Sequence, residues 1–146
     1  MKISTKGRYG LRVVLELTAQ HNRGPILVEN ISKSQAISGK YIRVLVGGLK
    51  SAGLVRAVRG PNGGYELARN PADITVLDVV RALEGKTVPV KCVEDVNSCP
   101  RAQFCAARDM WCEVAAAIDG VLSGLTMEQL AIRQRAKQEE PVMYCI

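Results

Sequence analysis

One glycine-rich segment constrains the fold of this chain more than any other feature of the sequence. Residues 59–64 read Arg-Gly-Pro-Asn-Gly-Gly and separate two short runs, residues 54–58 and 65–68, that carry Val, Leu and Tyr. An Asn-Gly pair between apolar runs is typical of a tight turn between two antiparallel strands. We therefore expect a β-hairpin at this point of the chain.

The residues before the hairpin have the pattern of two helices joined by a sharp turn. A helix over residues 28–35 is followed by a tight connection at 36–39 and by a helix over 40–52, which Gly53 ends. The second of these helices is amphipathic because its apolar residues recur at i, i+3, i+4 and i+7. Those apolar residues are Ile42, Leu45, Val46 and Leu49.

One further helix on each side completes the first domain. Thr5 is expected to cap a helix that runs to about residue 21. Thr75 is expected to cap a helix over residues 76–84, which Gly85 stops. With the hairpin as its wing, this arrangement predicts a winged helix-turn-helix domain over residues 1–86 and a mainly α fold.

A long helix is predicted over residues 101–125, with an apolar stripe too extensive for so small a domain to cover alone. A two-fold interface buries the same stripe from both subunits, so we expect a dimerisation helix and a homodimer. Packing within the same chain is the alternative. Capping-box spacing at residues 126–129 predicts a short terminal helix in residues 126–146. The stripe consists of Trp111, Val114, Ala115, Ile118, Val121 and Leu122.

Positive charge is concentrated in the first part of the chain. Residues 1–90 hold 14 Lys and Arg against 6 Asp and Glu, a net +8, whereas residues 91–146 hold 6 against 8, a net −2. Neutralisation of phosphates by Lys and Arg supplies most of the non-specific affinity of proteins for nucleic acid. We therefore expect this part to bind double-stranded DNA; a solvated basic surface without a partner is the alternative.

The helix over residues 40–52 is expected to read the major groove, because the first residues and the exposed face of such a helix reach base edges. Arg43 suits a bidentate contact with guanine, while Ser38 and Tyr41 suit phosphates. Packing against the wing is the alternative for Tyr41. The expected DNA contacts are Lys2, Lys6, Arg8, Ser38, Lys40, Tyr41, Arg43, Val44, Lys50, Arg59 and Gly60.

Arg59 stands at the start of the wing turn and is the residue singled out there. Narrow A·T-rich minor grooves attract arginine because they concentrate negative potential, and the adjacent Gly60 allows the backbone to approach. An ordinary exposed arginine in a turn is the alternative.

Three of the five cysteines lie in one polar segment, residues 87–107. The C-x6-C-x5-C spacing of Cys92, Cys99 and Cys105 is looser than the C-x2-C pairs of zinc fingers. Thiolates bind iron, iron–sulfur clusters, zinc or copper(I), and a flexible loop lets three sulfur atoms converge. We therefore expect a soft metal centre. Cys112 is expected to be a buried structural cysteine, and Cys145 lies outside the trio.

The start of the chain is charged and no unbroken apolar run follows it. We therefore expect neither a signal peptide nor contact with a membrane, and we expect a cytoplasmic protein. In that reducing compartment an odd number of cysteines favours metal binding or redox chemistry over a disulfide framework. The lone His21 has no catalytic constellation in the sequence, so we do not expect an enzyme.

Several stretches of the chain resemble the Rrf2 family of bacterial repressors, which includes IscR-, NsrR-, RirA- and CymR-type regulators. The resemblance covers roughly residues 1 to 130. It implies a homodimeric winged-helix transcription factor that binds a pseudo-palindromic operator. It also implies that the cysteine trio holds an iron–sulfur cluster, with 2Fe–2S favoured and 4Fe–4S possible. The matching stretches are MKISTKGRYGLR at 1–12, SAGLV at 51–55, RGPNGGY at 59–65 and ITVLDVV at 74–80.

The fourth cluster ligand departs from the pattern of the cluster-binding members. IscR-like members place a histidine three residues after the last cysteine, where this chain has Arg108, and NsrR-like members use an acidic residue where this chain has Arg8. An incompletely ligated cluster would be open to oxygen, nitric oxide or iron loss, which suits a sensor. The remaining candidates are Cys112, Asp109, Asp95, Glu94, His21 or a small exogenous molecule.

Two alternatives stay open for how such a regulator is controlled. CymR resembles the first half of the chain, but it lacks the trio and answers to a partner enzyme, as a repressor of cysteine metabolism. A structural zinc site in a DNA-binding protein is the other alternative.

Overall fold

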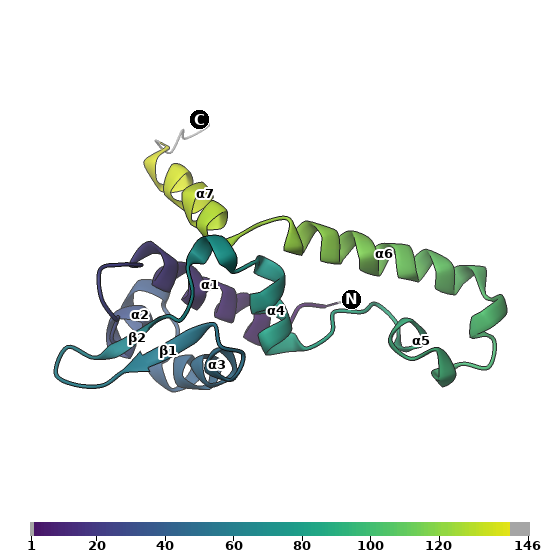
Figure 1. Ribbon diagram of the computed structural model, residues 1–146, viewed down its shortest axis with the longest axis horizontal. Coiled ribbons are helices and arrows are strands. Elements are labelled where there is room, and N and C mark those ends of the chain that lie inside the picture. Colours follow the sequence, from purple (N-terminus) through teal and green to yellow (C-terminus); the bar gives the residue numbers. More distant parts are fainter. Residues whose placement is uncertain (1, 141–146) are drawn as a thin grey trace, which may run out of the picture.

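The computed structural model describes residues 2–140, which form a helical body, a two-stranded wing and a projecting arm (Figure 1). The mainly helical architecture with one small hairpin is the one that the sequence predicts. In chain order the elements are α1 (Thr5–Ala19), α2 (Val28–Gln35), α3 (Gly39–Ser51), β1 (Val55–Val58), β2 (Gly64–Leu67), the 3-10 turn η1 (Pro71–Asp73), α4 (Val76–Glu84), α5 (Lys91–Glu94), the 3-10 turns η2 (Val96–Ser98) and η3 (Ala102–Phe104), α6 (Ala106–Ser123) and α7 (Met127–Glu139).

The helix-turn-helix is formed by α2 and α3. Ala36 adopts a left-handed conformation, φ 52° and ψ 44°, and this single residue makes the sharp turn after α2. The Ser38 side chain then caps α3 by accepting a hydrogen bond from the Tyr41 N–H at 3.2 Å. The two helix ranges therefore agree with the predicted ones to within one residue.

The wing is an antiparallel hairpin in which Val58 pairs with Gly64, so residues 59–63 form its turn. Gly64 has φ 149°, and a Cβ atom there would lie 2.3 Å from the Ile26 carbonyl oxygen. This close approach exists because Ile26 and Tyr65 exchange two backbone hydrogen bonds of 2.8 and 2.9 Å. The base of the wing is thereby fixed to the α1–α2 connection.

Two glycines allow α1 to pack closely against α4 at the centre of the body. A Cβ atom on Gly10 would lie 1.9 Å from Leu83 Cδ1, and one on Gly7 would lie 2.4 Å from Glu84 Oε1. Leu83 is buried and also touches the Gly48 position of α3. The core therefore depends on small residues of α1 to accommodate the last turn of α4.

The N-terminus of α1 is capped by Ser4, so the prediction that Thr5 caps this helix is wrong. Ser4 Oγ accepts hydrogen bonds from the N–H groups of Lys6 and Gly7 at 3.1 and 3.4 Å. Glu84, the last residue of α4, completes the cap by accepting hydrogen bonds from Ser4 N at 3.0 Å, from Gly7 N at 2.9 Å and from Ser4 Oγ. A carboxylate from α4 thus satisfies helix N–H groups that α1 cannot satisfy itself.

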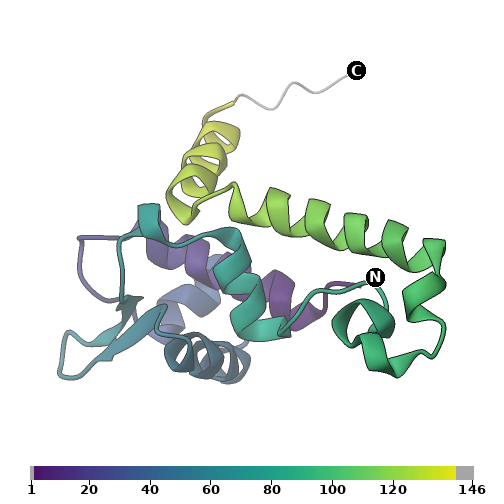
Figure 2. The same ribbon diagram turned by 45° about the vertical axis from the view of Figure 1, so that its right-hand side comes forward.

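The chain leaves the body after Gly85 and returns at Leu125, and we call residues 86–124 the arm. Backbone hydrogen bonds from Val76 N to Leu125 O (2.9 Å) and from Met127 N to Ile74 O (2.8 Å) close the arm at its base. Arg81 of α4 and Asp119 of α6 form an ion pair at 2.6 Å along it. Both views show α5 at the far end of the arm, away from the wing (Figures 1 and 2).

The second half of the chain agrees with the predicted domain boundaries only approximately. The long helix begins at Ala106, because residues 102–104 form a 3-10 turn instead. The terminal helix α7 has 13 residues and is longer than the short helix that we expected, although the capping box at Thr126 and Gln129 is present.

None of the helices within residues 2–140 combines the length and apolarity needed to cross a bilayer. Cys145 lies outside the described residues.

The close approach of α1 and α4 predicts that Gly10→Ala lowers the free energy of unfolding by about 1–3 kcal/mol, since the new methyl group displaces a buried side chain. Gly47→Ala is the matched control, because no atom lies within 4 Å of a Cβ placed on this exposed residue of α3. That control is expected to leave stability unchanged or raise it by up to about 1 kcal/mol. Urea denaturation measures both, and equal stabilities of the two variants would contradict this packing.

Candidate DNA-binding face and cysteine segment

The exposed face of α3 carries the residues that the sequence predicts to contact DNA. Lys40, Arg43, Val44 and Lys50 are exposed, and Val44 retains 56% of its accessible surface although it is apolar. The opposite face is fully buried, as predicted, and consists of Ile42, Leu45, Val46 and Leu49. An apolar side chain left in solvent beside three cations is suited to a thymine methyl group in a major groove.

The side chains of Arg43 and Tyr41 are oriented by neighbouring helices. Arg43 lies 3.5 Å from the Glu29 carboxylate of α2, an exposed ion pair. Tyr41 is half-buried and packs edge-on against Tyr9 of α1, with ring centroids 6.2 Å apart and an interplanar angle of 79°. Tyr41 therefore packs on α1 through its contact with Tyr9.

The wing and the start of α1 add further cations. Arg59 and Gly60 are exposed in the wing turn, and Gly60 has φ 115°, a conformation that favours glycine. Within residues 2–140, six of the cations predicted to contact DNA form no ion pair with any carboxylate. Their positive charge is therefore available to an anionic partner. These cations are Lys2, Lys6, Arg8, Lys40, Lys50 and Arg59.

The three cysteines lie on three consecutive short turns of the arm. Cys92 is in α5, Cys99 follows η2, and Cys105 caps α6. All three are free and partly exposed. The backbone of each turn is fixed mainly by local hydrogen bonds, such as Ala102 N to Cys99 O at 3.1 Å. Segments held by few long-range contacts rearrange at low cost.

The structure does not gather these side chains into a preformed metal site. Among the residues that it describes, no three His, Cys, Asp or Glu side chains lie close enough to hold a metal ion. His21 lines a small hollow together with the wing residues Arg56 and Glu66, and the wing lies at the opposite end of the molecule from α5 (Figure 1). The Asp95 carboxylate stabilises a local turn by accepting a hydrogen bond from Asn97 N at 2.9 Å.

The other fourth-ligand candidates lie on or next to the arm helices. Glu94 ends α5 and lines a hollow with Arg81 and Asp119. Asp109 is exposed in the first turn of α6. Cys112 is partly exposed and not buried as we expected, because α6 has no buried residue within this chain.

Arg108 connects two of the cysteine turns. Its Nε donates a hydrogen bond of 2.9 Å to the Cys92 carbonyl oxygen, and its own N–H donates to the Cys105 carbonyl oxygen at 3.0 Å. A guanidinium group is thereby held between α5 and the start of α6.

The predicted dimerisation stripe remains partly open to solvent. Val121 keeps 73% and Trp111 keeps 37% of their accessible surface, whereas Leu122 packs against the core of the body. A hollow of about 360 Å³ along α6 has a wholly apolar lining, made by Val114, Ala117, Ile118, Val121 and Leu122. Packing within the same chain therefore half-buries Val114, Ala115, Ile118 and Leu122 but leaves Trp111 and Val121 exposed.

The sequence patterns did not identify the residues whose contact partners lie far away along the chain. Glu84, Glu29 and Arg108 contact partners whose identity no local pattern reveals; Glu84, for example, bonds to Ser4, 80 positions away. Tyr9 was not singled out either, although it positions Tyr41. One indication was available in the sequence. Because α1 has no acidic residue in its first turn, another part of the chain has to complete its cap.

Comparison with known proteins agrees with this architecture. Residues 3–133 match the family model Rrf2, described as an iron-dependent transcriptional regulator. The chain is 40% identical over 144 residues to the HTH-type transcriptional regulator CymR of Bacillus subtilis, and the match covers 99% of each chain. A solved structure of CymR, the global cysteine regulator of B. subtilis, superposes with a TM-score of 0.77 over 91% of this chain and 98% of its own.

A second solved structure, IscR of T. potens, superposes equally well. Its TM-score is 0.77 at 32% identity, with 99% of this chain and 95% of that chain covered. All these relatives are transcriptional regulators, which confirms the expectation that the chain is not an enzyme. The chain belongs to the Rrf2 family and is a DNA-binding transcriptional regulator.

Proposed function

We propose that this protein is a homodimeric repressor whose affinity for a pseudo-palindromic operator is set by an iron–sulfur cluster bound to Cys92, Cys99 and Cys105. One observation carries the proposal. Three free, partly exposed cysteines occupy one arm, and that arm begins directly after Glu84, the residue that caps the cationic start of α1.

The donor set fits a soft metal centre in its chemistry. Three thiols on short turns of one segment match the ligands of iron–sulfur clusters, and the Arg108 side chain joins the Cys92 turn to the start of α6. Since the sulfur atoms are not gathered in this structure, cluster binding requires the turns to move. When bound, such a cluster supplies a redox-active group that oxygen or nitric oxide can destroy.

The residues of the chain provide a physical route from the arm to the DNA-binding face. Movement of α5 acts through residues 85–90 on the end of α4, where Glu84 holds the N-terminus of α1. Lys2, Lys6 and Arg8 flank that cap. A free-energy difference of about 2.7 kcal/mol between the two arm states suffices to change operator affinity about a hundredfold.

Dimerisation follows from the open stripe on α6. An exposed apolar surface with an empty hollow is typical of a protein–protein interface. Because a two-fold dimer presents two recognition helices, it matches an operator with two related half-sites. We infer that the fourth cluster ligand comes from the arm, from a residue of the partner subunit or from a small molecule.

A metal-free repressor controlled by a partner protein is the second candidate. The 40% identity to CymR over 99% of the chain favours it, as does the absence of gathered ligands in the described residues. A structural zinc site is a third possibility for the same thiols. The candidates differ in metal content, since zinc gives a colourless, air-stable protein and the second candidate holds no metal.

The cluster is tested by isolating the protein without oxygen. We expect iron and sulfide to copurify and operator affinity to change about a hundredfold when the cluster is removed. Cys92→Ala should abolish cluster binding, whereas Ser98→Ala, at an exposed position of the same segment, should not. Iron and sulfide analysis, Mössbauer spectra and DNA-shift titrations measure these effects. The proposal is contradicted if the isolated protein contains no iron, or if cluster-loaded and cluster-free protein bind the operator with equal affinity.

The wing contact is tested with two operators that differ only in the flanking base pairs. Arg59→Ala should weaken binding about tenfold at A·T-flanked sites and less at G·C-flanked sites, because only the narrow minor groove attracts the guanidinium. Arg133→Ala, an exposed arginine of α7, serves as the control. Equal losses at both operators would show that Arg59 does not read the minor groove.

The dimer interface is tested with Val121→Glu, which places a charge in the apolar hollow of α6. We expect the dimer dissociation constant to rise at least about tenfold, since burying an unpaired carboxylate in the interface is unfavourable in free energy. Ile132→Glu is the control, because Ile132 is also an exposed apolar residue (53%) but lies on α7 outside the hollow. Sedimentation equilibrium measures both. If Val121→Glu leaves the dimer dissociation constant unchanged, the dimer interface does not include this hollow.

A further inference from the structure

The Tyr9 side chain of α1 is surrounded by more than its contact with Tyr41. Its ring is half-buried and packs against the core of the body. Two guanidinium groups of α1 lie over the same ring, with the Arg8 Cζ 5.9 Å and the Arg12 Cζ 5.3 Å from the ring centroid. Both distances are within the range of cation–π contacts. One aromatic ring thus contacts two cations of α1 and the tyrosine in the first turn of α3.

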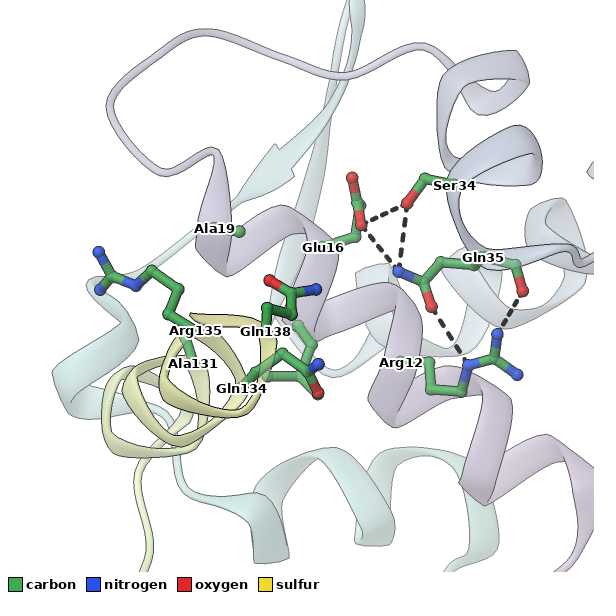
Figure 3. Close-up of a pocket in the computed structure, with 10 residues that line it drawn as sticks. Arg12, Glu16, Ala19, Ser34, Gln35, Ala131, Gln134, Arg135 and Gln138 are labelled. Carbon is green, nitrogen blue, oxygen red and sulfur yellow. Dashed lines mark hydrogen bonds between the residues drawn. The ribbon is translucent and has the colours of Figure 1, made fainter. Parts of the chain in front are cut away.

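Arg12 is bonded to the end of α2 and forms the fixed part of this cluster. Its Nε donates a hydrogen bond of 3.2 Å to Gln35 Oε1, and its Nη2 donates to the Gln35 carbonyl oxygen (Figure 3). Gln35 is in turn held by Glu16, whose Oε2 accepts a hydrogen bond of 2.8 Å from Gln35 Nε2. Because Gln35 is the last residue of α2, Arg12 satisfies a carbonyl group at the end of that helix. The Arg12 guanidinium therefore ties the Tyr9 ring to the helix-turn-helix.

Arg8 contacts the same ring but keeps its hydrogen-bonding groups free. Its side chain is exposed, and within residues 2–140 its guanidinium forms no ion pair and no hydrogen bond. A long side chain that binds a ligand loses rotamer entropy, and contact with a fixed ring removes part of that entropy in advance. The N–H donors of Arg8 are thus restricted in position and still available to an anion.

We propose that Tyr9 is a positioning residue for operator binding, because its ring holds the Arg8 guanidinium where it meets a phosphate of the DNA backbone. Tyr41, in the first turn of the recognition helix, contacts the same ring, so Arg8 is positioned relative to α3. Tyr9 itself need not touch DNA. The inference rests on the DNA-binding function and on the expected phosphate contact of Arg8, and no residue of the cysteine segment takes part.

The contacts of Tyr9 are made by its ring, since within residues 2–140 its hydroxyl group forms no hydrogen bond. Tyr9→Phe should therefore change operator affinity less than about twofold. Tyr9→Leu keeps an apolar side chain against the core but removes the aromatic face. It should weaken operator binding about tenfold, as measured by fluorescence anisotropy with labelled operator.

A double-mutant cycle separates positioning of Arg8 from a general loss of structure. Arg8→Ala should weaken operator binding about fivefold in the unchanged protein but less than about twofold in Tyr9→Leu, because the contact is already impaired there. Lys6→Ala is the control. Lys6 is an exposed cation of the same turn of α1 and makes no contact with an aromatic ring within residues 2–140. Its effect should be equal in both backgrounds.

The salt dependence of binding provides a readout that a purely structural role of Tyr9 would not change. Each phosphate contact contributes about 0.9 to the slope of the logarithm of affinity against the logarithm of salt concentration. Arg8→Ala should therefore lower the slope by about 1, and Tyr9→Leu should lower it in the same direction. Loss of folded protein alone would reduce the affinity and leave the slope unchanged.

The proposal is overturned if Arg8→Ala costs the same factor in both backgrounds, or if the slope is unchanged in Arg8→Ala or in Tyr9→Leu. Equal effects of Tyr9→Phe and Tyr9→Leu would overturn it as well. If circular dichroism shows that Tyr9→Leu does not fold, Tyr9→Met replaces it in the cycle, since the flexible methionine side chain adapts to the same space. All variants are measured as metal-free protein, so the result does not depend on whether a cluster is ever bound.

Discussion

The contact between the Glu84 carboxylate and the first turn of α1 connects the two functional parts of this protein. Glu84 accepts hydrogen bonds from Ser4 and Gly7, and it stands where the body ends and the arm begins. The glycines of α1 make this contact possible, because a side chain at Gly7 or Gly10 would occupy the space of Glu84 or Leu83. The cationic start of α1 is therefore held in place by the residue that would first sense movement of the arm.

The fold separates the surfaces that this regulator uses. The wing and α3 lie at one end of the body, and the cysteine turns lie at the far end of the arm (Figures 1 and 2). The arm is closed at its base by hydrogen bonds at Ile74 and Val76. In the proposed function, a change in the arm therefore reaches the body through α4 or through a partner subunit.

The sequence predicted those features that local chemistry determines. The capping boxes at Thr75 and Thr126, the amphipathic face of α3 and the turn of the wing each depend on residues a few positions apart, and all are present. The cap of α1 was assigned to Thr5 and not to Ser4, because the carboxylate that favours Ser4 comes from the far side of the domain. The Tyr9–Tyr41 pair is likewise a product of tertiary packing. In the proposed function, the arrangement of the three sulfur atoms would also depend on a bound cluster and on a partner subunit, and a single sequence specifies neither.

The central claim is that the state of the cysteine segment reaches the DNA-binding face through Glu84. Fluorescence anisotropy with labelled operator measures it directly, as the ratio of operator affinities between cluster-loaded and cluster-free protein. The account predicts a ratio of about a hundred in the unchanged protein and in the Glu128→Gln control, and below about ten in Glu84→Ala. If Glu84→Ala stays folded by circular dichroism and keeps the full ratio, the arm does not act through this contact.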